Sequence, residues 1–168
     1  MPRIKRTILI FLVLFSCVGC DQVTKHLAEQ SLINSGIISL FKDGFRLQYA
    51  ENPGAFLSLG AQIPEQWRYG LFTIAMGIFL IILVSYLLFS KGLNQTESVS
   101  LALVAGGGIG NLIDRLIHHG RVVDFLNLGI GQVRTGIFNF ADIAITLGVI
   151  WLGILCIRGQ LHCSRIDN

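Results

Sequence analysis

Charged residues are scarce in this chain of 168 residues, of which 14% are Asp, Glu, Lys or Arg and 52% are hydrophobic. So few polar side chains do not cover the surface of a soluble globule of this size. The 13 basic and 10 acidic residues leave a formal charge of only +3, and the basic residues form no stripe with stacking aromatics. This pattern excludes a typical nucleic-acid-binding surface. We predict an integral membrane protein with one domain, residues 1–168.

Cysteine is equally sparse. The four cysteines, Cys17, Cys20, Cys156 and Cys163, lie in or near predicted helices, and none lies in the long polar connector where a disulfide framework would be expected. Cys17 and Cys20 form a C-x-x-C pair, but the chain has no second pair to complete a zinc site. We therefore expect inert buried thiols, no metal and no cofactor.

Several catalytic and nucleotide-binding motifs are also absent. The sequence has no G-x-S-x-G and no H-E-x-x-H, and His26, His118, His119 and His162 are not spaced as metal ligands. The glycine-rich run at 105–111 has no phosphate-loop lysine and does not complete G-x-G-x-x-G. These absences argue against serine hydrolases, zinc peptidases and nucleotide-binding proteins.

Long apolar runs, in contrast, are present throughout the chain. Three are long enough to span a membrane, at 69–89, 98–117 and 136–157. The first run, 7–20, gives only about 21 Å of helix, which by itself fits a cleavable leader better than a span. Because three spans follow, we extend it to residue 27, about 31 Å, and predict an uncleaved first helix at 7–27.

The flanking charges predict the orientation of the four helices. Arg3, Lys5 and Arg6 hold the N-terminus in the cytoplasm, and four spans return the C-terminus to the same side. The long connector 28–66 and the loop 121–135 then lie outside.

The outer connector carries a strand signal. Residues 45–49 alternate apolar and polar side chains, which predicts a half-buried strand, and the Asn-Pro-Gly run at 52–54 predicts a turn. The predicted fold class is an all-α membrane protein, with four transmembrane helices and a small extracytoplasmic β-sheet on the outer membrane surface.

Four acidic side chains are predicted at membrane depth, where ionisation has a high free-energy cost. Asp21, Asp114, Asp124 and Asp142 are all predicted near one depth, at the outer ends of the helices. An ionised side chain inside a bilayer costs several kcal/mol, so each acid needs a partner or a function. Lys25, four residues after Asp21 on one helix face, is the expected partner of that residue.

Amides accompany two of these acids at helical spacing. Asn111 precedes Asp114 by three residues, and Asn139 precedes Asp142 by three, so we expect each pair on one helix face. The G-x-x-x-G at 106–110 lets another helix approach closely. These groups could also serve only to hold the helices together.

Two acids that lack counter-ions predict a catalytic function. If Asp124 and Asp142 meet, they share one proton, as an aspartic peptidase requires: one carboxylate activates water while the other polarises the scissile carbonyl. Whether Asp124 or Asp114 partners Asp142 stays open in the sequence. The alternatives are a small ion- or proton-coupled membrane transporter and a non-enzymatic chaperone for lipid-modified proteins.

Five motifs in order along the chain resemble those of the bacterial lipoprotein signal peptidases, or type II signal peptidases. They lie at 21–25, 52–56, 107–115, 122–126 and 138–142, and the resemblance covers nearly the whole chain. It implies an aspartic endopeptidase of the bacterial inner membrane, with its site toward the periplasm. Its partners would be diacylglyceryl-modified prolipoproteins and membrane lipids, and we expect a monomer.

The resemblance also assigns roles to residues of this sequence. The catalytic pair falls on Asp124 and Asp142. Residues that bind substrate or support the site fall on Asn52, Gly54, Asn111, Asp114, Arg115 and Asn139, and structural support falls on Asp21 and Lys25. The substrate-binding sheet would be the segment 45–59.

Overall fold

The computed structural model describes residues 2–53 and 64–159, and within them the chain has four helices and four strands. The helices are α1 (Arg3–Leu32), α2 (Glu65–Phe89), α3 (Gln95–Ile117) and α4 (Phe140–Ile157). Each is long and apolar enough to cross a membrane. The predicted fold class, four spanning helices with a small sheet, is confirmed.

The observed helix ends differ from the predicted ones. Helix α1 has 30 residues, because it begins at Arg3 rather than at residue 7 and continues past its apolar part to Leu32. Helix α4 begins at Phe140 rather than at residue 136, because Asn139 caps it with a side chain that accepts from the Asp142 amide. Helix α3 likewise begins after Asn94, whose side chain and that of Glu97 form a capping box.

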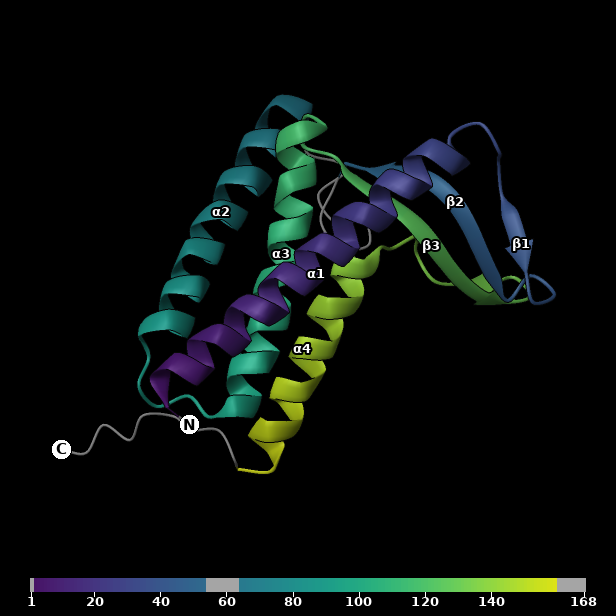
Figure 1. Ribbon diagram of the computed structural model, residues 1–168. Helices are drawn as coiled ribbons and strands as arrows, with labels where there is room; N and C mark the ends of the chain where they lie inside the picture. Colours follow the sequence, from purple (N-terminus) through teal and green to yellow (C-terminus); the bar gives the residue numbers. More distant parts are fainter. Residues whose placement is uncertain (1, 54–63, 160–168) are drawn as a thin grey trace.

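Helix α3 packs against the other three helices of the bundle (Figure 1). Its glycines explain the close approach. A Cβ on Gly106 would lie 2.7 Å from the Cys17 side chain of α1, and one on Gly107 would clash with the Ala141 backbone oxygen of α4. The predicted G-x-x-x-G contact is therefore present, with α1 as the partner of Gly106 and Gly110.

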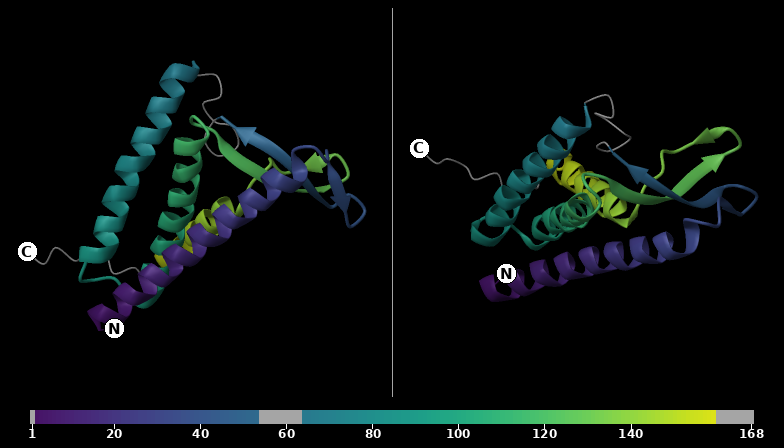
Figure 2. Two further views of the ribbon diagram at one scale, coloured as in Figure 1. Left: turned by 45° about the horizontal axis from the view of Figure 1, so that its top comes forward. Right: turned by 90° about the horizontal axis from the view of Figure 1, so that it is seen from above.

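The sheet consists of β1 (Ile38–Leu40), β2 (Phe45–Asn52), β3 (Val122–Ile130) and β4 (Val133–Arg134), all antiparallel and in that order. It extends sideways from one end of the bundle, beside the C-terminal half of α1 (Figure 2). A cluster formed by Ala28, Leu32, Phe125 and Leu126 packs α1 against the sheet.

Two expectations for the outer segments need correction. The stretch predicted as the loop 121–135 forms β3 and β4. Its first six residues, Val122 to Asn127, are all buried, so the run lacks the alternation by which a half-exposed strand is recognised. The predicted strand 45–49 is part of the longer β2, whereas the end of the expected 45–59 sheet segment, from residue 54, lies outside the described residues.

Candidate active site

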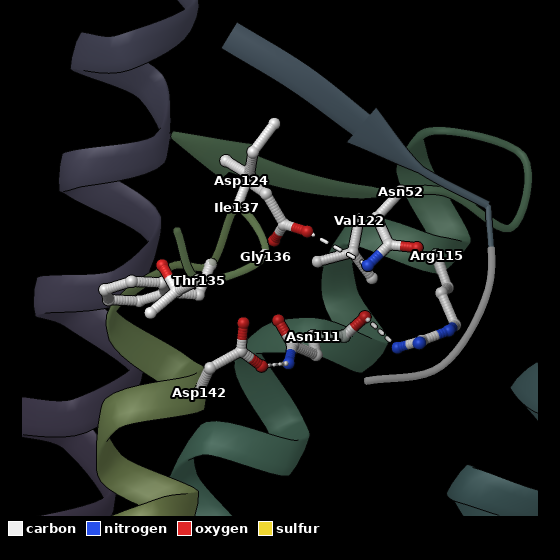
Figure 3. A pocket seen from close by; sticks show the side chains of 10 residues that line it. Asn52, Asn111, Arg115, Val122, Asp124, Thr135, Gly136, Ile137 and Asp142 are labelled. Atoms are coloured by element: carbon white, nitrogen blue, oxygen red, sulfur yellow. Dashed lines mark hydrogen bonds between the residues drawn. The ribbon is translucent and has the colours of Figure 1, made fainter. Parts of the chain in front are cut away.

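A small pocket lies where the sheet meets the beginning of α4 (Figure 3). It offers about 60 Å³ of space in which a water-sized sphere fits. A water molecule needs about 10–15 Å³ on this measure, so the pocket has room for several waters or part of a peptide. The residues lining it are Asn52, Asn111, Arg115, Val122, Asp124, Thr135, Gly136, Ile137, Phe138 and Asp142.

Asp124 enters this pocket from β3 and is only 2% exposed. Its Oδ2 accepts from Asn52 Nδ2 at 3.0 Å, and its Oδ1 accepts from Asn139 Nδ2 at 2.7 Å. Burial, followed by the nearby charge of Asp142, raises the pKa of Asp124 from 3.8 to about 7. Asp124 therefore holds its proton far more tightly than an exposed aspartate does.

Asp142 enters the same pocket from the first turn of α4. Its Oδ1 accepts from Asn111 Nδ2 at 3.1 Å, and its Oδ2 accepts from the Asn139 backbone N–H at 3.2 Å. The N-terminal end of a helix favours negative charge, because the free N–H groups of the first turn point toward it. Asp142 is thus placed where a carboxylate is stabilised.

Asn139 contacts both acids and is fully buried. Its side-chain amide donates to Asp124, while its backbone N–H donates to Asp142. The prediction that Asn139 and Asp142 lie on one face of a helix is wrong, since Asn139 is the residue that caps α4. The three-residue spacing that looked helical is that of a capping box.

Asp114 is not among the described residues that line the pocket. Its Oδ2 accepts from Lys25 Nζ at 2.9 Å and from the Val123 N–H at 3.0 Å, and its Oδ1 accepts from Gln22 Nε2 at 2.9 Å. Both oxygens are therefore engaged in joining α3 to α1 and β3. Of the two acids left open by the sequence, Asp124 is the one that faces Asp142 (Figure 3).

Lys25 and Asp21 form the expected ion pair, with Lys25 Nζ 2.8 Å from Asp21 Oδ2. Both side chains are buried, and Asp21 also accepts from the Ala141 N–H at 2.9 Å, beside Asp142 at the start of α4. Lys25 in addition donates to Asn111 Oδ1 at 2.9 Å. Because Lys25 occupies the oxygen of this amide, the Nδ2 end of Asn111 is directed toward Asp142.

The remaining predicted site residues divide into two groups. Asn52 and Arg115 line the pocket, and Arg115 Nη1 donates to the Asn111 backbone oxygen at 3.1 Å. Gly54 lies outside the described residues.

Some pocket residues were missed in the sequence. Residues 135–138 line the pocket, and they directly follow β4, which lies in the stretch predicted as a loop. Gln22, which binds Asp114, carried no signal in the sequence beyond its place between Asp21 and Lys25. The capping box of Asn139 was the one local pattern that would have located the start of α4.

The described residues include no group of three or more His, Cys, Asp or Glu side chains placed to hold a metal ion. Cys17, Cys20 and Cys156 are free thiols. Cys20 is exposed rather than buried as expected for the C-x-x-C pair, Cys156 is exposed as well, and Cys163 lies outside the described part of the chain.

Comparison with known proteins gives consistent matches along most of the chain. Residues 13–158 match the sequence model of the family described as Signal peptidase (SPase) II. A lipoprotein signal peptidase from Borreliella burgdorferi (strain ZS7) is 40% identical over 146 residues, which cover 84% of this chain and 85% of the relative. The lipoprotein signal peptidase of Syntrophus aciditrophicus (strain SB) is 32% identical over 161 residues, covering 95% of this chain and 99% of the relative.

Solved structures agree with these matches. A structure described as a bacterial membrane enzyme, determined by the in meso method at 2.3 Å resolution, has a TM-score of 0.78 and 27% identity, covering 95% of this chain and 93% of that one. A second structure, described in the same way at 1.9 Å resolution, has a TM-score of 0.76 and 29% identity, covering 89% of this chain and 92% of that one.

Proposed function

Since this chain belongs to the signal peptidase II family, whose members are membrane proteases, we propose that it is an aspartic endopeptidase of prolipoproteins. It removes the signal peptide by cutting before the diacylglyceryl-modified cysteine. The observation that carries the proposal is the pair of acids, Asp124 and Asp142, facing one pocket with Asn139 bound to both.

The two acids differ in a way that assigns their tasks. Asp142 lies at the N-terminal end of α4 and accepts from Asn111 and Asn139, so it is the ionised carboxylate of the pair. Asp124, with a pKa raised to about 7, keeps the shared proton. Two close carboxylates of this kind titrate as a unit, with one proton between them.

Hydrolysis then follows by general acid–base catalysis. Asp142 takes a proton from water as the water oxygen bonds to the scissile carbonyl carbon, and Asp124 donates its proton to the carbonyl oxygen. The resulting tetrahedral intermediate returns a proton to Asp124 and breaks its C–N bond, while Asp142 gives its proton to the leaving amine. Both acids end in their starting states, and one water has been consumed.

The position of the pocket suits a substrate held in the membrane. It lies at the sheet end of the bundle, where α4 begins, so a lipidated precursor moving sideways in the bilayer reaches it with its acyl chains still in hydrocarbon (Figure 1). In our proposal this end faces the periplasm and both termini face the cytoplasm of a bacterial inner membrane. The chain works as a monomer of one domain, with membrane lipids around it.

The test replaces each acid by its amide. We expect Asp142→Asn and Asp124→Asn each to lower the rate of precursor cleavage by about 10²–10⁴, because neither variant can share a proton. Conversion of a lipidated precursor by the purified protein, followed by mass spectrometry, measures the rate. Glu29→Gln, a carboxylate on α1 that is not among the described pocket residues, is the matched control and should cleave normally.

Asp114→Asn separates the two candidate partners. This variant should lose stability more than activity, because Asp114 binds Lys25 and Val123 rather than facing the pocket. Cleavage at the unchanged rate by a folded Asp124→Asn variant, with loss of cleavage in Asp114→Asn, would overturn the assignment.

A further inference from the structure

The end of the sheet farthest from the helices is made by two turns that lie side by side. The β1–β2 turn is residues 41–44, and the β3–β4 turn is residues 131–132. The Gly129 N–H donates to the Gly44 backbone oxygen at 3.0 Å, which joins the two hairpins. We call residues 41–44 and 130–133 the sheet tip.

The sheet tip exposes three large apolar side chains. Phe41 is 86% exposed, Ile130 is 90% exposed and Val133 is 81% exposed. They come from both hairpins and gather at one end of the sheet, with the exposed Lys42 next to Phe41. Apolar side chains gathered in this way mark a surface that meets another apolar phase.

The backbone of the first turn is strained. Phe41, Lys42 and Asp43 have φ angles of 52°, 54° and 70°, in the left-handed region that residues other than glycine rarely adopt. Asp43 holds this turn: its carboxylate accepts from Arg46 Nη2 at 2.6 Å and from Arg134 Nη1 at 3.2 Å. The fold therefore maintains a strained turn whose exposed residues are an aromatic and a lysine.

Two adjoining and mainly apolar grooves connect the sheet tip to the outward-facing side of α4. One groove runs over α4 and β3 and is lined by Phe138, Ile143, Leu147 and Leu128. A second groove, lined by Leu128, Ile130 and Val133 among others, continues from it to the tip. Leu128 and Thr135 line both grooves.

The tip lies at about the level at which the span α4 begins. In Figure 1 the sheet leaves the bundle and its far end comes down to the level at which α4 begins. Helix α4 is a membrane span whose outward-facing residues, such as Leu147, Val149 and Ile150, are exposed and apolar. A bilayer that covers the first turn of α4 therefore reaches the depth of the tip.

We infer that the sheet tip is a membrane contact, in which Phe41, Ile130 and Val133 insert into the interfacial layer of the leaflet on the sheet side. Lys42 lies among the lipid phosphates, as basic residues next to interfacial aromatics do. This contact supports the sheet, and so β3 and Asp124, from the end opposite the bundle. The contact itself does not depend on the proposed chemistry.

A fluorescent residue at the tip tests this inference. The chain has two tryptophans, both at exposed positions, Trp67 and Trp151, which are replaced by Phe. Into this background we place Phe41→Trp, or Ile130→Trp as a second reporter should the first variant not fold. Asn34→Trp, in the exposed turn after α1, is the matched control. Each variant is reconstituted in phosphatidylcholine–phosphatidylglycerol vesicles, with bromine on the acyl chains near the headgroup, and folding is checked by circular dichroism.

The inference predicts a clear contrast between the reporters. Tryptophan at 41 or 130 should lose most of its fluorescence in brominated vesicles relative to unbrominated ones, while tryptophan at 34 should keep it. Equal quenching of the tip and control reporters would overturn the inference. Protection of the tip from the bromine with cross-linking of residue 41 to a second copy of the chain would overturn it as well, since the surface would then bind protein. These readouts do not require activity, so they are independent of the proposed function.

Discussion

At the scale of single residues, the notable feature is an aspartate that keeps its proton near neutral pH. Burial and the charge of Asp142 raise the pKa of Asp124 to about 7, whereas the unfolded chain releases this proton near pH 3.8. Between these values the folded state binds more protons, so the Asp124 contribution to stability is full in acid and is lost as pH rises through about 7. Its protonated form is the one that the proposed chemistry uses.

The pH dependence of cleavage tests this. We expect kcat/KM to fall above pH 7, by about tenfold per pH unit, as the pair loses its last proton. Asn52→Ala removes a hydrogen bond that favours the charged form of Asp124, so the fall should begin about one pH unit higher. Rates measured in buffers from acid to alkaline pH give the midpoint, with Asn34→Ala as the control. A midpoint that stays in place or moves down in Asn52→Ala would contradict the assignment.

At the scale of elements, α3 is central because its glycines allow three helices to approach its backbone. A Cβ at Gly106 or Gly110 meets α1, one at Gly108 meets Leu80 of α2, and one at Gly107 meets α4. The contact at Gly107 is with the backbone of Ala141, next to Asp142, and a backbone atom cannot swing away as a flexible side chain does.

Gly107→Ala should therefore destabilise the protein and weaken the site together. A Cβ at this position would clash with the Ala141 backbone oxygen, so α4 must shift, at a cost of about 1–3 kcal/mol. Thermal unfolding in detergent measures the stability, and precursor cleavage measures the displacement of Asp142. Gly77→Ala is the matched control, because no atom lies within 4 Å of its added Cβ. That variant should be neutral or gain about 0.5–1 kcal/mol; equal losses in both would contradict the packing argument.

At the scale of the whole molecule, one buried polar network joins the parts that carry the two acids. Lys25 of α1 binds Asp21, Asp114 and Asn111, and through them reaches α3, β3 and the start of α4. Asp124 belongs to the sheet and Asp142 to the bundle, so their geometry depends on how the sheet is fixed to the helices.

Removal of Lys25, the central cation of this network, should destabilise the protein. Lys25→Met leaves two buried carboxylates without their partner, and we expect a loss of about 3–5 kcal/mol in the free energy of unfolding. The double variant Lys25→Met with Asp114→Asn removes one of these charges, so it should lose less than the sum of the two single variants. Denaturation in mild detergent measures all three. Additive losses would show that Lys25 and Asp114 act independently.

The local patterns of the sequence determined the four membrane spans and identified the four aspartates at membrane depth as candidate functional residues. Hydropathy is a property of contiguous residues, and the cost of a charge in a membrane applies wherever the charge lies, so both could be read without a structure. The same local reading failed at residues 122–127, because a strand segment in which every residue is buried has no alternation, and at Asn139, because its spacing to Asp142 fits both a helix face and a cap.

The tertiary structure alone decided which aspartate faces Asp142. Asp114 and Asp124 lie at similar predicted depths, and although the resemblance favours Asp124, the residue pattern around each acid allows either one to meet Asp142. The distance between side chains on different elements is set by how α1, α3, α4 and the sheet pack, and that packing gives Asp114 to Lys25 and leaves Asp124 at the pocket. The sequence thus determined which acidic side chains the sheet end of the bundle carries, and the fold decided which two of them face one pocket, because only packing brings together residues that are distant in the chain.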